Sequence, residues 1–294
     1  MTHVQNQPSP ARRLPRVSVK RPLLRYFGGK WQLRHWIGAL LPEHQFYAEP
    51  FAGAASVLLS KEPAVGGEII NDLNRDIINL FRVMQSVEKS ALLQRRLAWT
   101  PYSAAELELS REATDDPVEK ARRMLIRSFM GLEVAGVRGT NSGFRMGNVD
   151  LRRLDKSGKR TFRNCARDWI NWKCALPAIR DRLSEVMIYE KDAIEFIDLM
   201  DAPECLLYVD PPYVHSTRAS TRYTVEFEKH DALVQRLLSI KAMVVLSGYE
   251  SEIYKPLVSA GWQKVTKDFR ANMSTTRRIE CLWISPNAQM GMAY

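Results

Sequence analysis

Two consecutive prolines directly follow a short apolar run and limit how the middle of this chain can fold. Leu206–Val209 is mostly apolar and short, which indicates a buried strand. Pro211 and Pro212 end that strand, because neither can donate a hydrogen bond to a sheet ladder. Asp210 and Tyr213 are therefore expected at the carboxyl end of a strand, where ligands bind in open α/β sheets. The plainer alternative is a strand that ends in a tight turn with a surface aspartate.

Short apolar segments on both sides of this point predict the rest of an α/β sheet. Phe46–Leu59 predicts a strand, a small-residue turn and a helix, and Gly66–Asn74 predicts the next strand. We predict helices over Trp31–Leu41, Arg75–Gln85, Lys120–Phe129, Ala193–Leu199 and Phe227–Ser239, and further strands over Val186–Tyr189, Ala242–Ser247 and, as an antiparallel pair, within Gln263–Ile284. The alternation of strands and helices predicts an α/β fold class.

The turn after the first strand and the acid after the second have the spacing of a nucleotide-binding unit. Alanines surround Gly53, and small residues there let a ligand approach the turn closely. Asp72 follows about twenty residues later, where an acid can accept hydrogen bonds from ribose hydroxyls. The alternative is that Asp72 or Asn74 caps the following helix.

Two adjacent glycines, Gly28 and Gly29, follow an aromatic pair near the start of the chain. Glycines in this position let the backbone turn closely around a ligand. Lys30 comes next, where the helix Trp31–Leu41 is expected to begin. A cation is unusual there, because a helix N-terminus carries partial positive charge. The alternative for Lys30 is a solvated lysine on a loop.

The charge and composition favour a polyanionic partner. The net charge is +10 and the pI is near 9.5, as in proteins that bind nucleic acid. The alternative is a basic surface that serves solubility alone. No apolar run approaches the roughly 18 residues that span a membrane, and the N-terminus lacks an apolar signal-peptide core. Residues 1–20 are predicted to be a flexible basic arm. The scattered cysteines are expected to be buried reduced thiols in a reducing cytoplasm, with no zinc site: Cys165, Cys174, Cys205 and Cys281.

Glycines, arginines and aromatic residues crowd the region from about residue 104 to 177. Loops of this composition suit phosphate contact, base-edge readout and insertion between bases. We therefore predict an inserted or adjoining module there, against the alternative of a solvated basic face over a small core. Arg138 and Arg145 flank its glycine-rich turn and are assigned to base readout, while the helical Arg122 and Arg123 contact phosphates or are solvated.

Three segments together resemble motifs of the Dam-like group of DNA adenine-N6 methyltransferases. Phe27–Lys30 is similar to that family's N-terminal cofactor motif, and Glu49–Gly53 is similar to its first strand-turn motif. Asp210–Tyr213 matches its catalytic motif without a change, and the motif order is also the family's. Gly143 and Phe144 resemble the family's recognition hairpin, although Arg145 stands where Asn is common.

The resemblance implies a Rossmann-like S-adenosylmethionine-dependent methyltransferase sheet with an inserted, mainly helical target-recognition module at residues 104–177. The catalytic domain would comprise residues 21–103 and 178–294. The implied reaction moves a methyl group from S-adenosylmethionine to the N6 amine of a flipped adenine in double-stranded DNA, without a metal. Asp72 would bind the ribose hydroxyls and Asp192 the cofactor's adenine.

The resemblance also implies a set of site residues. Asp210 and the Pro211 carbonyl would accept the two amine hydrogens, and Tyr213 would hold the flipped base. The catalytic residues are Asp210, Pro211, Pro212 and Tyr213. The cofactor-binding residues are Tyr26, Phe27, Gly28, Gly29, Lys30, Glu49, Pro50, Phe51, Ala52, Gly53, Ser56, Asp72, Asp192 and Asp210. The DNA-binding residues are Arg138, Asn141, Phe144, Arg145, Arg218, Arg222, Tyr223 and Arg277.

Two other functions stay open. The same tetrapeptide can serve methylation of cytosine N4 or of adenine in RNA. The chain could also bind DNA without catalysis on a degenerate methyltransferase scaffold, although the intact Asp210–Tyr213 segment argues against this. The partner expected is double-stranded DNA and not a membrane, and the sequence leaves open a homodimer, a partner restriction enzyme and the recognition sequence.

Overall fold

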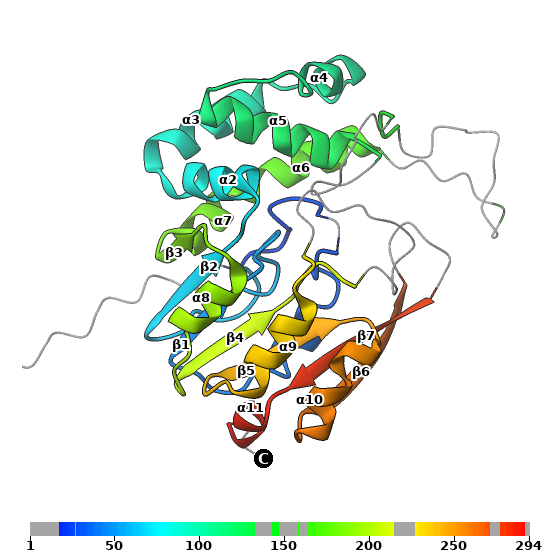
Figure 1. Ribbon diagram of the computed structural model, residues 1–294. Helices are drawn as coiled ribbons and strands as arrows, with labels where there is room; N and C mark the ends of the chain where they lie inside the picture. Colours follow the sequence, from blue (N-terminus) through cyan, green and yellow to red (C-terminus); the bar gives the residue numbers. More distant parts are fainter. Residues whose placement is uncertain are drawn as a thin grey trace, which may run out of the picture.

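The computed structural model describes residues 18–26, 28–132, 143–146, 158, 164–214, 227–270 and 277–291. Within these residues, seven strands form one sheet in the order β3-β2-β1-β4-β5-β7-β6 (Figure 1). The strands are β1 Phe46–Glu49, β2 Gly67–Asn71, β3 Val186–Tyr189, β4 Cys205–Val209, β5 Met243–Gly248, β6 Gln263–Arg270 and β7 Arg277–Ile284. The strands β1 to β5 pair in parallel, and β7 is antiparallel to both β5 and β6.

The sheet is buried on both faces, as its apolar central strands require. In β4, Leu206 and Tyr208 pack on one face in a hydrophobic cluster that includes Val245 of β5. Leu207 and Val209 point to the opposite face and belong to a second cluster. The strand order reverses between β1 and β4, because β2 and β3 lie on one side of β1 and β5 on the other side of β4. This reversal places a topological switch point at the carboxyl ends of β1 and β4.

Helices cover the sheet and gather at one end of it (Figure 1). The helices are α1 Arg34–Gly38, α2 Arg75–Gln85, α3 Val87–Ala98, α4 Ala104–Leu109, α5 Pro117–Met130, α6 Cys165–Lys173, α7 Leu176–Leu183, α8 Ala193–Leu199, α9 His230–Leu238, α10 Lys255–Ser259 and α11 Pro286–Met290. In Figure 1, α2 to α6 lie together above the sheet, and α8 and α9 cross in front of it. The fold is α/β with a Rossmann-like sheet, as predicted.

The long helices begin and end where local chemistry dictates. The side chain of Asn74 accepts from the backbone N–H of Asp76 at 3.0 Å, so the N-cap of α2 is Asn74 and not Asp72. Asp116 caps α5, and Pro117 occupies its first turn, where a missing N–H costs nothing. The helix α5 packs against α2 and α3, both of which precede residue 104. The division into a catalytic domain and a module at residues 104–177 stays a prediction.

Several predicted boundaries are correct and others are wrong. The predicted limits of α2, β3 and α8 and of the β6–β7 pair agree with the structure. The helix predicted over Trp31–Leu41 is shorter in the structure, where only α1, Arg34–Gly38, is helical. Turns flank it, one of them closed by a hydrogen bond from the Leu33 N–H to the Lys30 carbonyl. The helix predicted after β1 is a series of turns, because Gly53 and Ala55 both have φ of +48°, which is not helical. The predicted helix Phe227–Ser239 is shorter at both ends, since α9 spans His230–Leu238.

Two further expectations concern the cysteines and the membrane. Cys165, Cys205 and Cys281 are buried free thiols, whereas Cys174 is exposed because it lies just past the end of α6. In the described ranges, no helix combines the length and the apolar character that crossing a bilayer requires.

Candidate active site

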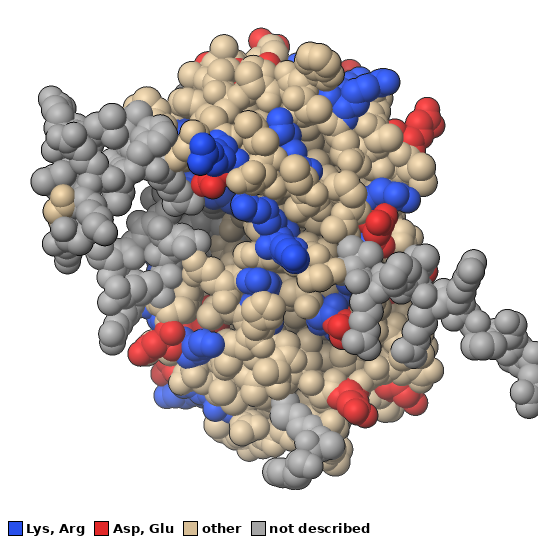
Figure 2. All heavy atoms as spheres, turned by 180° about the vertical axis from the view of Figure 1, so that it is seen from behind, with Lys and Arg blue, Asp and Glu red and all other residues tan. Residues whose placement is uncertain are grey.

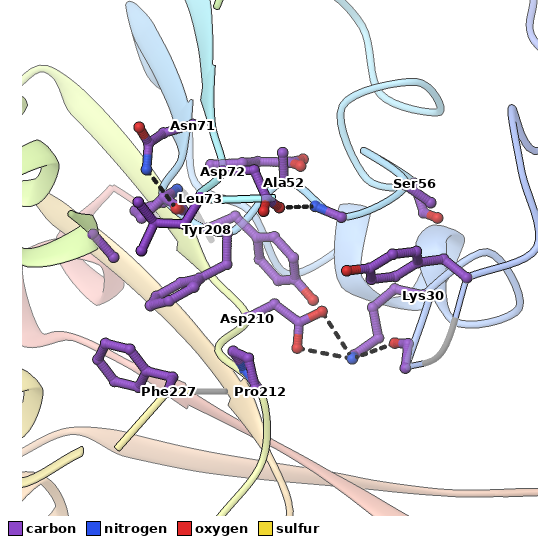
Figure 3. Close-up of a pocket in the computed structure, with 18 of the residues that line it drawn as sticks. Lys30, Ala52, Ser56, Asn71, Asp72, Leu73, Tyr208, Asp210, Pro212 and Phe227 are labelled. Carbon is purple, nitrogen blue, oxygen red and sulfur yellow. Dashed lines mark hydrogen bonds and ion pairs between the residues drawn. The ribbon is translucent and has the colours of Figure 1, made fainter. Parts of the chain in front are cut away.

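A cavity with an empty volume of about 860 Å³ opens at the carboxyl ends of β1, β2 and β4 (Figure 3). This is the switch point of the sheet, where the sequence places its candidate residues. Nearly all the predicted cofactor residues line it, namely Tyr26, Gly28, Gly29, Lys30, Glu49, Pro50, Phe51, Ala52, Gly53, Ser56, Asp72, Asp192 and Asp210. Phe27 lies outside the described residues. Pro212 also lines the cavity, while Pro211 and Tyr213 are not among its lining residues.

The turn after β1 needs glycine at position 53. With φ of +48°, Gly53 adopts a left-handed conformation that other residues rarely take. A Cβ atom there would lie 3.0 Å from the Tyr26 ring, which packs against the turn. The close contact and the backbone conformation together exclude a larger residue at position 53. The backbone of the turn can therefore form one wall of the cavity directly.

Asp72 ties this turn to the end of β2. Its Oδ2 accepts from the Gly53 backbone N–H at 2.8 Å (Figure 3). Its Oδ1 accepts from the Asn74 N–H at 2.8 Å. Burial raises the pKa of the Asp72 carboxyl above its usual range, and these backbone bonds oppose that rise. The Leu73 N–H also bonds to this carboxylate, but a carboxylate has about four lone-pair sites, so the side chain can still accept from a ligand.

Asn71, which the sequence reading passed over, joins three strand ends. Its Nδ2 donates to the carbonyls of Pro50 and Lys191, both at 3.0 Å, and its Oδ1 accepts from the Lys191 N–H at 2.8 Å. These bonds link positions 21 and 120 residues apart and use both hydrogens of the amide nitrogen. The signal available in the sequence was an asparagine at the end of the predicted strand, directly before Asp72.

Lys30 is paired with Asp210, so the alternative of a solvated lysine is wrong. Its Nζ lies 2.8 Å from each carboxylate oxygen of Asp210 and 2.8 Å from the Gly28 carbonyl (Figure 3). The Lys30 side chain is 5% exposed and that of Asp210 is 17% exposed, so Asp210 is not a surface turn residue. The loop Gly28–Lys30 therefore brings a cation 180 residues along the chain to the end of β4.

Tyr213 lies behind Asp210, toward β5 and β7. Its hydroxyl donates to Oε1 of Glu280, and the edge of its ring meets the Tyr249 ring at a centroid distance of 4.4 Å. The Lys30 Nζ lies 4.7 Å from the Tyr213 ring centroid and 3.7 Å from Oε1 of Glu280. Sequence reasoning missed Glu280. The signal that could have found it is a single acid within the apolar run of β7.

Two acids on the cavity wall have opposite protonation preferences. Burial raises the pKa of Asp210 to about 6, against the attraction of the Lys30 ammonium, and the negative charge of Glu280 adds to the rise. Burial raises the pKa of Glu49 to about 8, although its Oε1 accepts from the Tyr47 hydroxyl and the Leu58 N–H, both at 2.8 Å. At neutral pH, Asp210 is thus mainly ionised and Glu49 mainly protonated. Separated pKa values of this kind are typical of active sites.

Replacing Glu49 with glutamine should reduce the pH dependence of folding stability. The pKa of Glu49 is about 8 in the folded chain and near 4.5 when unfolded, so the folded state holds an extra proton between these values. The stabilisation is complete below about pH 4.5 and is lost as the pH rises through about 8, with a slope of up to about 1.4 kcal/mol per pH unit. Urea unfolding from pH 5 to 9 should show a flatter profile for E49Q. The exposed control E204Q should keep the original slope, and an unchanged slope in E49Q would contradict the assignment.

The predicted DNA-contacting residues are only partly described. Phe144 and Arg145 lie against the carboxyl end of α5: Phe144 bridges Gly131, and the Arg145 N–H donates to the Met130 carbonyl at 2.7 Å. The Phe144 ring packs 5.1 Å from that of Tyr102. Arg138, Asn141, Arg218, Arg222 and Tyr223 lie outside the described residues, and of Arg277 the backbone begins β7.

Two arginines that were predicted to contact phosphates or solvent, Arg122 and Arg123, form ion pairs within the protein instead. Arg122 is 9% exposed and forms ion pairs with Glu106 and Glu119, so neither a solvated side chain nor a free phosphate contact fits it. Arg123 also pairs with Glu119, at 2.8 Å. Figure 2 nevertheless shows lysine and arginine side chains in a row down the middle of one face of the molecule. Charge of this sign can meet a polyanion.

Comparison with known proteins agrees with the motifs. Residues 26–112 match the family model of D12 class N6 adenine-specific DNA methyltransferases. The DNA adenine methylase of Vibrio cholerae is 32% identical over 83 residues, which are 28% of this chain and 29% of that protein. That of Serratia marcescens is 30% identical over 112 residues, 37% of this chain and 41% of the relative. The DNA N-6-adenine-methyltransferase of Escherichia phage P1 is 26% identical over 92 residues, 31% of this chain and 12% of the relative.

The matched segments therefore cover less than half of each of these relatives. The family match includes the Gly28–Lys30 loop, the turn at Gly53 and the acid Asp72, all of which meet at the cavity. The predicted resemblance is confirmed over this segment. Over residues 26–112, this chain is therefore similar to the D12 class N6 adenine-specific DNA methyltransferases.

Proposed function

We propose that this chain is an enzyme that transfers a methyl group from S-adenosylmethionine to the N6 amine of adenine in double-stranded DNA. The observation that carries the proposal is the Lys30–Asp210 pair at the switch point of the sheet, on the wall of the cavity that the predicted cofactor residues line. Asp210 begins an intact Asp-Pro-Pro-Tyr segment. The relatives named above act, by their printed names, on adenine in DNA.

The cavity residues fit S-adenosylmethionine. The cavity has apolar walls together with a few polar groups that point into it, as is typical of small-ligand sites. Asp72 and Asp192 stand after β2 and β3 and offer acceptors for ribose hydroxyls and for the adenine amine. Phe51 and Phe227 meet edge to face with centroids 5.0 Å apart and provide an apolar wall for the adenine ring. When bound, the cofactor supplies an electrophilic methyl group on a sulfonium.

The chemistry assigned to Asp210 is acceptance of a hydrogen from the target amine. The lone pair of an exocyclic adenine amine is conjugated with the ring, which makes the amine a poor nucleophile. Hydrogen bonds from the amine to the Asp210 carboxylate and the Pro211 carbonyl favour a geometry in which the lone pair points at the methyl group. Asp210 must be ionised for this role. The proximity of Lys30 supports the ionised form, since an adjacent cation favours a carboxylate.

Double-stranded DNA is the proposed partner. The net charge of +10 and the row of basic side chains in Figure 2 support phosphate contacts. Arg138 and Arg145 remain assigned to base readout, and Tyr213 to holding a flipped base. Tyr213 is 5% exposed in this structure, so its ring must become accessible for a base to reach it.

The proposal is tested by measuring transfer of tritiated methyl from S-adenosylmethionine to three substrates. The first is a DNA duplex in which adenine is the only base of the tested strand with an exocyclic amine. The second is a matched duplex in which cytosine replaces each of these adenines. The third is an RNA with the sequence of the first duplex. Label in the adenine duplex alone supports the proposal. Label on cytosine or RNA would assign the site to another amine. Cofactor binding without transfer to any substrate would leave a DNA-binding protein on a methyltransferase scaffold.

Replacing Asp72 with alanine should weaken S-adenosylmethionine binding by about 1.5–3 kcal/mol, as expected for a hydrogen bond to a charged group. The same change frees the Gly53 and Asn74 N–H groups, so some loss of folding stability is also expected. Isothermal titration calorimetry measures the cofactor affinity, and DNA affinity without cofactor serves as the control. Asp72→Asn keeps the shape of the side chain and one backbone acceptor. If cofactor and DNA affinity fell together in both variants, Asp72 would be purely structural.

A further inference from the structure

Glu280 is a buried glutamate whose carboxylate lies beside the proposed catalytic pair, with its Oε1 3.7 Å from the Lys30 Nζ. It lies on β7 with 1% of its surface exposed. Leu282, two residues further along the strand and thus on the same face, belongs to the hydrophobic cluster that contains Tyr208. The carboxylate therefore points to the face on which Lys30 and Asp210 lie. A carboxylate this deeply buried requires partners.

The partners of Glu280 are Ser247 of β5 and two groups of the candidate site, Lys30 and Tyr213. Its Oε1 accepts from the Ser247 hydroxyl at 2.6 Å and from the Tyr213 hydroxyl. The Lys30 Nζ lies 3.7 Å from the same oxygen and 2.8 Å from both oxygens of Asp210. One ammonium is thus shared by two carboxylates, and one of them also holds the aromatic residue of the Asp-Pro-Pro-Tyr segment.

We propose that Glu280 is a positioning residue of this site, which fixes Tyr213 through its hydroxyl and shares the Lys30 ammonium with Asp210. The inference deepens the proposed function and rests on it for its kinetic part. Glu280 does not touch the substrate in this account. It acts through the residues that do.

Sharing the ammonium makes Asp210 a better acceptor. In a one-to-one pair, Lys30 would neutralise Asp210 and hold its lone pairs. A second negative charge nearby weakens that neutralisation and leaves Asp210 more basic. A hydrogen acceptor works best when its pKa lies close to the operating pH, so a more basic Asp210 assists the amine more strongly.

The charge balance around Asp210 includes groups from several elements. Those that face it are Lys30, Glu280, Glu49, Tyr208, Tyr213 and Tyr254. Of these, Lys30 is the cation, and its attraction opposes the burial that raises the pKa of Asp210. Glu280 raises that pKa further, so removing its charge should lower it.

Two variants of Glu280 separate its charge from its hydrogen bonds. Glu280→Gln keeps an acceptor oxygen for Tyr213 and Ser247 but removes the negative charge. Glu280→Asp keeps the charge but is one methylene shorter, so it withdraws from both hydroxyls. The matched control is Glu68→Gln: Glu68 is also buried, with a 5% exposed side chain, and its partners Lys61 and Arg182 lie outside the cavity lining.

The first readout is the titration of Asp210 in the free protein, followed by carbon-13 NMR of labelled aspartate carboxyls and assigned with Asp210→Asn. The midpoint should move down by about one pH unit in E280Q. It should stay near the original value in E280D and in E68Q. This measurement needs neither cofactor nor DNA, so it decides the coupling even if adenine methylation were not observed. An unchanged midpoint in E280Q would overturn the shared ammonium.

The second readout is the single-turnover rate of methyl transfer against pH. The acid limb of E280Q should shift to lower pH with the NMR midpoint. E280D should keep the wild-type limb but lose about 10–100-fold in rate at every pH, because Tyr213 is displaced. Wild-type rates in E280D, with the protein folded by circular dichroism, would overturn the positioning role. An inactive wild-type enzyme would instead refute the proposed function and leave the NMR result to decide the inference.

Discussion

Replacing Asp210 with alanine should lower the rate of methyl transfer to adenine by about 10²–10⁴-fold, the range that a positioned acid or base contributes. The variant loses the carboxylate that is proposed to accept the amine hydrogen, while the Pro211 carbonyl remains. Folding should survive, because Asp210 follows the last residue of β4 and Lys30 keeps Glu280 as a neighbour. The measurement is a single-turnover assay with labelled S-adenosylmethionine and duplex DNA.

Two controls make the Asp210 result interpretable. Cofactor affinity by calorimetry should change far less than the rate, which separates chemistry from binding. Asp231→Ala, at an exposed position in the first turn of α9, should leave the rate unchanged. Near-normal turnover in Asp210→Ala would remove Asp210 from the mechanism.

Replacing Lys30 with methionine should affect both activity and stability. The variant leaves two buried carboxylates, Asp210 and Glu280, without their shared cation, and removing one partner of a buried ion pair costs about 3–5 kcal/mol. Loss of the ammonium also raises the pKa of Asp210, which in the wild type is about 6. In the proposed mechanism Asp210 acts in its ionised form, so wild-type activity should fall as the pH drops through about 6, and the variant should lose activity at a higher pH.

Chemical unfolding at neutral pH measures the loss of folding stability predicted for Lys30→Met. The pH profile of the single-turnover rate measures the predicted shift in the pH at which activity is lost. Lys61→Met is a matched control, because the Lys61 side chain is only 7% exposed and is paired with a glutamate, at 2.6 Å, but lies outside the cavity lining. It should destabilise the fold without moving the acid limb. An acid limb at the wild-type pH in Lys30→Met would contradict the pairing of Lys30 with Asp210.

The sequence predicts this fold well where a pattern is local. The helix α2 starts at Arg75 because the side chain of the preceding Asn74 caps its first turn, and the limits of β3 and α8 agree with their short apolar segments. The segment after β1 was mispredicted as helix because its small apolar residues suit one. The positive φ of Ala55 depends on the tertiary packing of the turn and has no local signal.

The candidate site divides in the same way. Gly53, Asp72 and Asp210 were predictable, because each follows a strand and has a residue type suited to a turn or to catalysis. Lys30 was predicted for the cofactor motif only, since its partner lies 180 residues away. Glu280 could not be assigned from sequence, because its role depends on the β5–β7 pairing that brings it beside Ser247 and Tyr213.

The most direct test of the proposed activity is to map modified bases in the DNA of cells that express this chain. Sequencing that detects modified adenines should find N6-methyladenine in one recurrent sequence context in cells with the wild-type protein. The mark should be absent from cells with Asp210→Ala at equal protein level. Modified cytosine in place of adenine, or an identical adenine pattern in both strains, would contradict the account.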